Sequence, residues 1–179
     1  MITPKKLSVS DRNNIGYQYT DCPLYWISVI YLNFAEAKAE MGSLTQDDLN
    51  NSINKLQARA GLPAMTTTPD ADPANNMGVS NLIWEIRRCR RCELIMDNWY
   101  RYWDLIRWHQ LDKLDSTKYP NTMLGANVSN VPDCEEATKN GYIDASDAQI
   151  RTYEAKHYFY PIPTTQLTLN KNMKQNPGW

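Results

Sequence analysis

The chain has 179 residues, enough for one domain to bury a core of its own. Its formal net charge of −1 gives no overall field that would attract nucleic acid or an anionic membrane. The cysteines at positions 22, 89, 92 and 134 are too few and too scattered for a disulfide-built scaffold. The most apolar run, residues 24–32, is too short for a membrane span, and the first ten residues do not resemble a signal peptide.

Residues 1–23 are polar and lack a sustained period, so we interpret them as a loose lead-in. Residues 24–62 are predicted to form an antiparallel helical hairpin. Its first helix, in LYWISVIYLNFAEAKAEMG, is apolar on nearly every side for three turns, which predicts a buried helix that ends at Gly42. Its second helix begins at a capping box of Thr45 and Asp48 and ends at the next glycine.

Residues 63–81 hold three prolines and almost no apolar side chains, which predicts a loop. Its DADPAN segment is similar to the start of a calcium-binding loop. The glycine and the final glutamate of that motif do not stand at the required spacing, so an ordered calcium site is not expected.

Residues 82–114 are predicted to form a helix pair divided near residue 98. At 100° per residue, one broad face of the first helix carries Leu82, Ile86, Cys89, Cys92 and Met96. The i, i+3, i+4, i+7 rule places on one face of the second helix Trp99, Tyr102, Trp103 and Ile106.

Beyond residue 114 the helical period is lost. Residues 115–179 are predicted to be an irregular segment and a tail, with a short helix capped by Thr164 or Thr165. An irregular stretch of this length in a compact domain is usually either functional or disordered. The sequence therefore predicts one mostly α domain over residues 1–179, with helical hairpins and long irregular loops.

The two cysteines in the CxxC segment, Cys89 and Cys92, favour packing over metal binding. Neither a second cysteine pair nor a histidine pair stands close enough to complete a four-ligand zinc site. The two sulfurs share a helix face with apolar side chains, where small hydrophobic packing explains them.

The arginines at positions 87, 88, 90 and 91 spread over more than one face of their helix. A nucleic-acid surface would need a continuous basic stripe and net positive charge, so we interpret these arginines as braces between neighbouring helices. The pairs expected from helical spacing are Arg90 with Glu93, Arg101 with Asp97, and Asp104 with Arg101 or Arg107.

Catalysis has little support in the sequence. The two histidines, His109 and His157, belong to no recognisable metal or nucleophile motif, and no glycine-rich phosphate loop is present. The 20 acidic residues offer many carboxylate pairs for glycoside cleavage, but nothing selects one of them. We expect no enzyme activity, no cofactor and no metal.

Five segments in order resemble the C-terminal region of SusD/RagB family proteins: YLNFAEAKAEMG, INKLQARAGLP, RRCRRCELIMDN with RYWDLIRW, YFYPIP and QNPGW. They cover most of the chain, and their order makes the resemblance far more specific than one motif would be. The positions that carry this signature are Glu36, Arg59, Arg90, Arg91, Glu93, Arg101, Asp104, Arg107, Trp108, Pro161, Pro163, Asn176 and Pro177. The chain departs from the family pattern at Cys89, where glutamate is usual, and at Asp97-Asn98, where Glu-Gly is usual.

The resemblance implies a fold of TPR-like helical hairpins and a binding function without catalysis. It implies an exported lipoprotein on the outer-membrane surface of Bacteroidetes-type bacteria. Such a protein would cap a SusC-like TonB-dependent porin and capture glycans, or sometimes peptides, for import. Family members are much longer than this chain, so we expect it to be a C-terminal portion whose lipid anchor lies elsewhere.

The matched motifs are scaffold motifs and identify no ligand-binding residue. Sugars stack their C–H faces on aromatic rings, so the candidates for glycan contact are loop tyrosines: Tyr17 or Tyr19 in the lead-in, and Tyr142 and Tyr153 in the irregular segment. An ordinary surface tyrosine would explain each position as well. Two other functions stay open: a helical interaction module that binds only its porin partner, and a hydrolase.

Overall fold

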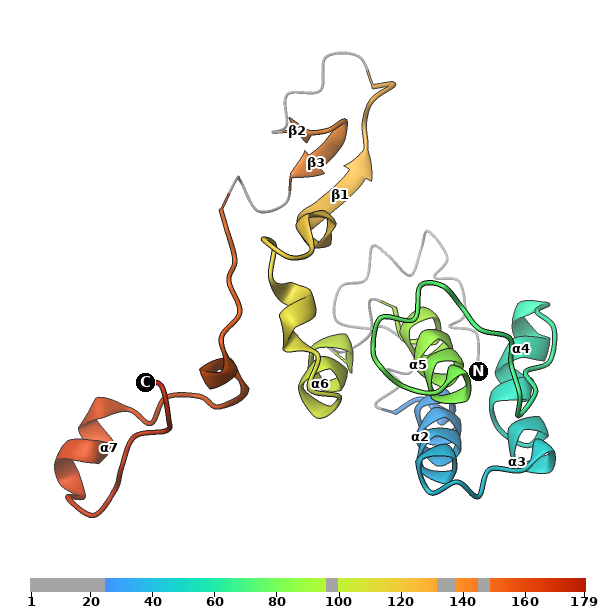
Figure 1. The fold of residues 1–179 in the computed structure, drawn as a ribbon, viewed down its shortest axis with the longest axis horizontal. Helices are drawn as coiled ribbons and strands as arrows, with labels where there is room; N and C mark the ends of the chain where they lie inside the picture. The colour runs from blue at the N-terminus through green and yellow to red at the C-terminus, as the bar shows by residue number, and fades with distance from the viewer. Residues whose placement is uncertain (1–24, 96–99, 132–137, 145–148) are drawn as a thin grey trace, which may run out of the picture. The chain divides into compact units, whose positions relative to one another are not determined.

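The computed structural model describes residues 25–95, 100–131, 138–144 and 149–179 (Figure 1). The chain divides into two compact units, residues 1–98 and residues 99–179. One domain over the whole chain therefore stays a prediction, whereas the mostly helical class is confirmed in the described residues. Tyr17, Tyr19, Asp97 and Trp99 lie outside the described residues.

Helices account for the regular structure of the first unit (Figure 1). They are α2 (Ile27–Glu40), α3 (Gln46–Asn50), α4 (Ile53–Ala60) and α5 (Asn81–Glu93). Helix α2 packs against α4 and α5, which also contact each other. The apolar core between them includes Val29, Leu32, Ala35, Leu49, Ile53, Leu56 and Ile86.

The second half of the predicted hairpin is two short helices instead of one. The capping box is confirmed, because the Thr45 hydroxyl accepts from the Asp48 amide at 3.1 Å and the Asp48 carboxylate accepts from the Thr45 amide at 2.9 Å. The helix is interrupted at Ser52, whose φ of −131° and ψ of −97° are not helical. Gly61 ends α4 in the left-handed conformation that glycine adopts without strain, as predicted.

The prediction that α2 is buried on every side is wrong for the described part of the chain. Val29, Leu32 and Ala35 are buried. On the other side of the helix, Ile30 is 57% exposed and Phe34 is 41% exposed. Helices α4 and α5 both pack on α2, and together they leave this apolar face uncovered.

Buried ion pairs connect the helices of the first unit. Arg87 on α5 donates from Nε to Glu36 at 3.1 Å and from Nη2 to Glu40 at 3.2 Å, both on α2. Glu36 is only 2% exposed and Arg87 8%, so this pair is desolvated and its geometry matters. On the other side of α5, Glu93 pairs with Arg59 of α4.

Arg90 also braces the helices, with a 2.8 Å hydrogen bond from its guanidinium to the Asn33 side chain of α2. The prediction that the arginines of α5 brace neighbouring helices is therefore confirmed for Arg87 and Arg90. It is wrong for Arg88, which pairs with Glu85 of its own helix. Arg91 is exposed and no partner among the described residues is identified for it, so it is not one of these braces.

The two cysteines of α5 differ in their surroundings. Cys89 is partly buried, and burial raises the pKa of its thiol to about 12, with the charge of Glu93 adding to the effect. Cys92 is exposed, so the prediction that both sulfurs pack on one face is wrong for Cys92. A thiol held protonated near neutral pH is a poor nucleophile, which agrees with a packing role for Cys89.

Side-chain hydrogen bonds fix the loop between α4 and α5 at two places. Asn54, buried on α4, exchanges hydrogen bonds with the main chain of Met65 at 2.7 and 3.1 Å. In the DADPAN segment, the Asp72 carboxylate accepts from the Trp84 indole and the Ala74 amide. Asp72 therefore serves as a hydrogen-bonded anchor for α5.

The second unit has shorter elements and more turns (Figure 1). They are α6 (Tyr100–Arg107), η1 (Leu111–Leu114), η2 (Pro120–Met123), β1 (Leu124–Asn127), β2 (Thr138–Lys139), β3 (Tyr142–Asp144), η3 (Ala155–Tyr158) and α7 (Thr164–Leu169). The helix predicted over 99–114 ends at Arg107, because His109 adopts a φ of +53° that a helix cannot contain. The predicted short helix is present as α7, but the predicted cap is wrong, because the helix begins at Thr164, Pro163 stands at its N-cap and no side chain caps it.

The face of α6 that carries the aromatic side chains is not its buried face, because Trp103 is 56% exposed. The buried residues are Asp104, Leu105 and, just beyond the helix, Trp108. Arg107 donates to Asp104 at 3.3 Å, which confirms that pair, and its guanidinium lies 5.1 Å from the Trp108 ring centre. Arg101 lies over the same indole at 5.9 Å.

A small antiparallel sheet in the order β1-β3-β2 lies within the segment predicted to be irregular (Figure 1). Asn140 and Gly141 join β2 to β3, with φ values of +54° and +79°. Asn-Gly with two positive φ values is the preferred two-residue hairpin turn. A side chain at Gly141 would also collide with the Ser129 hydroxyl, 2.1 Å from the Cβ position.

Candidate functional site

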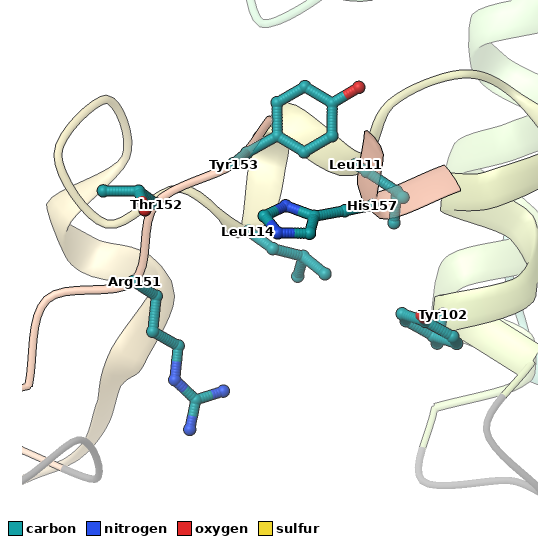
Figure 2. A pocket seen from close by; sticks show the side chains of 7 residues that line it. All are labelled: Tyr102, Leu111, Leu114, Arg151, Thr152, Tyr153 and His157. Carbon is teal, nitrogen blue, oxygen red and sulfur yellow. The ribbon is translucent and has the colours of Figure 1, made fainter. Parts of the chain in front are cut away.

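The second unit contains a pocket of about 330 Å³ (Figure 2). Its lining combines three rings, two leucines, a threonine and one arginine: Tyr102, Tyr153, His157, Leu111, Leu114, Thr152 and Arg151. This volume lies near the lower end of the range for ligand pockets, and the mixture of apolar walls with a few polar groups is typical of them. The pocket therefore fits one small ring-shaped ligand or one unit of a longer chain.

One wall of the pocket is an extended segment tied to the turn after η1. The Ser116 amide donates to the Arg151 carbonyl at 2.9 Å, and the Arg151 amide donates back to the Ser116 hydroxyl at 2.9 Å. The Tyr153 amide donates to the Asp115 carboxylate at 3.0 Å. These bonds stand in for a strand ladder and fix the backbone from which Arg151 and Tyr153 project.

Asp115 organises this connection. Its carboxylate accepts from the Thr117 hydroxyl and amide, the Tyr153 amide and the Lys118 amide. The Thr117 hydroxyl, followed by the Tyr153 amide, lowers the pKa of Asp115 to about 2, since hydrogen bonds to a carboxylate favour its charged form. Asp115 is therefore ionised at neutral pH, and its hydrogen bonds hold the loop in place.

The Tyr153 ring packs edge-on against Tyr158, with ring centres 5.7 Å apart. Its hydroxyl points away from Arg151 in Figure 2. Partial burial and the hydrogen bond to Tyr158 raise the pKa of Tyr153 to about 12, so the hydroxyl stays protonated. Tyr158 in turn accepts from the Leu111 amide at 3.2 Å, which ties η3 to η1.

His157 is oriented by a hydrogen bond from the Glu154 amide to its Nδ1 at 3.0 Å. When the ring is neutral, this bond assigns the proton to Nε2, which becomes a donor. The His157 ring also packs edge-on against Trp179, 5.9 Å between centres. Figure 2 shows the imidazole between the labelled side chains of Tyr153 and Leu114.

The C-terminal tail supports this wall of the pocket. The Trp179 indole donates to the Phe159 carbonyl at 2.9 Å and to the Lys156 carbonyl at 3.2 Å. The Lys156 ammonium lies 5.2 Å from the centre of the indole ring. The last residue of the chain therefore holds the short η3 helix that carries His157.

The tail also pairs with the YPIP segment through side chains. Both neighbours of Ile162 along the chain are prolines, Pro161 and Pro163, which have no amide hydrogen to donate. The Gln175 amide group binds both the Ile162 amide and its carbonyl, at 2.8 and 2.9 Å. Asn176 adds a 2.6 Å bond to the Tyr160 carbonyl. The Gln175 side chain thus makes the two bonds that a residue of an antiparallel partner strand would exchange with Ile162.

Tyr102, on α6, completes the lining. Its hydroxyl lies 3.4 Å from that of Tyr160, and this hydrogen bond raises the pKa of Tyr102. The hydroxyl of Tyr102 is therefore engaged with Tyr160, and its ring packs against Trp103, with ring centres 5.5 Å apart.

Of the tyrosines predicted to contact a ligand, the structure places Tyr153 in the pocket lining. Tyr142 lies on β3, is 38% exposed and is not part of the lining. Tyr17 lies outside the described residues. The sequence analysis did not select Tyr102, Arg151 or His157, although the aromatic density of YEAKHYFY around His157 was a usable signal.

The described residues contain no cluster of three or more histidine, cysteine, aspartate or glutamate side chains able to hold a metal ion. Within the same described residues, no helix has the length and apolar character needed to cross a membrane.

A sequence profile of the SusD family matches residues 1–179, the whole of the chain. The chain belongs to the SusD family. Among solved structures, this SusD-family chain is similar to a SusD-like protein from Bacteroides fragilis, with a TM-score of 0.62 and 25% sequence identity. The match covers 94% of this chain and 29% of that protein, so the chain spans under a third of its relative's length. No curated protein matches.

In this SusD-family chain, the signature residues fall into two groups. Those of the first unit, such as Glu36, Arg59 and Arg90, brace helices through ion pairs and hydrogen bonds. In the second unit, Asn176 and its neighbours tie the tail to YPIP and to η3. The tail of the matched QNPGW segment therefore supports the wall of the pocket, through Asn176 and Trp179, although it supplies none of the lining residues.

Proposed function

We propose that this chain belongs to a glycan-binding component of an outer-membrane nutrient uptake system. It captures oligo- or polysaccharide at the cell surface and passes it to a SusC-like TonB-dependent transporter. The protein that carries it is a surface-exposed lipoprotein held to the membrane by a lipid anchor, and it acts by binding without catalysis. The observation that carries the proposal is a ring-lined pocket with polar donors in a chain of the SusD family.

The chemistry of the pocket suits a sugar. The C–H faces of a pyranose ring pack against flat apolar surfaces, which Tyr102, Tyr153 and His157 supply. The hydroxyl groups of a sugar need donors and acceptors, which Thr152 and Arg151 provide. Leu111 and Leu114 add apolar surface without competing polar groups.

A direct test is isothermal titration of the protein with soluble oligosaccharides, combined with an assay for reducing ends. We expect binding without product formation. Tyr102→Ala should weaken binding through loss of a stacking surface, by roughly two- to tenfold if the ring contributes about 0.5–1.5 kcal/mol. Tyr142→Ala is the matched control, because that ring lies outside the pocket.

The comparison of these two tyrosines locates the site. If Tyr142→Ala removes binding and Tyr102→Ala does not, the glycan binds on the small sheet instead of in the pocket. If no glycan binds at all, or if reducing ends are released, the proposal of a non-catalytic glycan receptor is wrong.

A second candidate function is a helical interaction module that binds only its porin partner. The exposed apolar face of α2, with Ile27, Ile30 and Phe34, favours it, because apolar patches on helices are typical of protein contacts. Co-purification of a TonB-dependent barrel with a protein that has no glycan affinity would support this candidate over the first.

A further inference from the structure

Arg151 is the one guanidinium in the pocket lining. Its main chain is fixed by the hydrogen bonds to Ser116 at 2.9 Å, so the side chain projects from a defined position. No hydrogen bond or ion pair joins its guanidinium to another described residue, whereas Arg87 and Arg59 of the same chain are paired with glutamates. The five donors of Arg151 are therefore available to a ligand.

The acidic residues near Arg151 do not compensate its charge, since Glu154, the nearest described acid along the chain, pairs with Lys156 at 3.2 Å. No aspartate or glutamate is among the lining residues. The Asp115 carboxylate accepts hydrogen bonds from Thr117, Lys118 and the Tyr153 amide. Asp112 acts on the Tyr153 hydroxyl, where its charge helps to raise the pKa. The pocket thus presents one cation and no lining carboxylate.

A second donor accompanies the guanidinium. Because the Glu154 amide occupies Nδ1 of His157, the neutral imidazole carries its proton on Nε2. The lining therefore combines a planar cationic fork, an N–H donor and flat ring surfaces. Carboxylates match the planar fork of arginine with two parallel hydrogen bonds.

We infer that this pocket takes a sugar unit that carries a carboxylate, that is, a uronic acid within an acidic glycan. Arg151 binds the carboxylate, the rings of Tyr102 and Tyr153 flank the sugar, and His157 donates to one of its oxygens. The volume of about 330 Å³ sets the scale at a single sugar unit. The inference rests on the proposed function, since it assigns a ligand class to the same pocket.

The experiment is isothermal titration of the protein with oligosaccharides of galacturonate, glucuronate and mannuronate, each beside its methyl-esterified form. Esterification removes the negative charge of the carboxylate and leaves the sugar ring unchanged. We expect at least one acid to bind, and esterification to weaken its binding roughly ten- to a hundredfold, the range for a lost hydrogen bond to a charged group. Rising salt should weaken binding of the acid more than that of the ester.

Arg151→Gln should weaken binding of the acid far more than binding of the ester, so the preference for the acid over the ester is lost. Arg91→Gln is the matched control, an exposed arginine in the other unit with no partner identified among the described residues. Because the Arg151 guanidinium makes no bond to other described residues, the substitution should not unfold the chain, and a thermal melt checks this.

The outcomes separate this inference from the proposed function. If acids and esters bind equally, or only neutral glycans bind, the inference is overturned while glycan capture stands. If a sulfated oligosaccharide binds and no uronate does, the assignment of a carboxylate is overturned. If no glycan of either class binds, the proposed function fails, and the inference fails with it.

Discussion

Different interactions stabilise each of the two units of the chain. In the first unit, α2, α4 and α5 bury an apolar core and are joined through paired side chains such as Arg87 with Glu36. In the second unit, side chains bond directly to the main chain of distant segments, as Asp115 does to Tyr153 and Gln175 does to Ile162. Regular helices supply stiffness in the first unit, while individually placed polar side chains supply it in the second.

This difference has a functional consequence. Loops fixed by side-chain hydrogen bonds can present several different groups around one space, which a helix face cannot do as freely. The pocket lies in the unit built in that way, and Trp179 of the tail supports its wall. Substitutions in the two units should therefore have different consequences, global in the first unit and local in the second.

The largest effect is expected at the buried ion pair of the first unit. Glu36→Ala removes the buried carboxylate that pairs with the Arg87 guanidinium and leaves the half-exposed Glu40 as its carboxylate partner on α2. We expect the free energy of unfolding to fall by about 3 kcal/mol, the lower end of the range for breaking a buried pair. Urea denaturation followed by far-UV circular dichroism measures this loss.

Glu85→Ala is the control, because Glu85 pairs with Arg88 on the surface of one helix. Its effect should stay below about 1 kcal/mol. Equal losses in the two variants would contradict the claim that buried pairing joins the helices.

The next effect is expected at the tail of the second unit. Gly178 has a φ of +86°, and a Cβ there would lie 2.9 Å from the Lys156 Cβ. Gly178→Ala should therefore displace Trp179 from η3, lower stability by about 1–3 kcal/mol and loosen His157. Thermal melts and the histidine signals in an NMR spectrum report the two changes.

Gly78→Ala serves as the matched variant, with a φ of +67° and no atom within 4 Å of its Cβ position. This variant has the backbone strain without the collision. Its loss of stability should therefore be smaller, and the His157 signal should not change. A larger effect at Gly78 would argue against the tail as a support of the pocket.

A smaller and purely local effect is expected from pH. The folded pKa of Asp115 is about 2, below its ordinary value of 3.8, so its stabilising contribution is complete above about pH 4. It is lost as the pH falls through about 2, when the carboxylate gains a proton. Near-UV circular dichroism of the tyrosines between pH 5 and pH 2 should follow this change, and Asp115→Asn should remove that part of the transition.

The smallest expected effect concerns the cysteines of α5. The pKa of about 12 keeps the Cys89 thiol protonated at pH 8, whereas Cys92 is exposed. Iodoacetamide followed by peptide mass spectrometry should find Cys92 modified well before Cys89. Faster modification of Cys89 would mean that it lies in an accessible, charged site.

Local signals in the sequence predicted the first unit well. The capping box at Thr45, the helix end at Gly61 and the bracing arginines all depend on neighbours within a turn or on charge spacing. The break at Ser52 was not visible, because an apolar period continues across it. The exposed side of α2 was also missed, since composition says that a face is apolar but not whether a neighbour covers it.

The second unit was harder to predict because its order comes from contacts between distant residues. More than 20 residues separate the bonded partners Ser116 and Arg151, and also Lys156 and Trp179. No periodic pattern in the sequence predicts hydrogen bonds of this kind. One local signal was overlooked, the Asn140-Gly141 pair that turns β2 into β3. Tyr153 could be selected as an aromatic residue in a loop, but its pocket could not be foreseen.

The most direct test of the central claim is a crystal structure of the protein with the tightest-binding oligosaccharide identified by titration. Our account predicts electron density for a sugar ring against Tyr102 and Tyr153, with an acidic group beside Arg151. A sugar bound at saturating concentration on another surface, with these side chains free of it, would contradict the account.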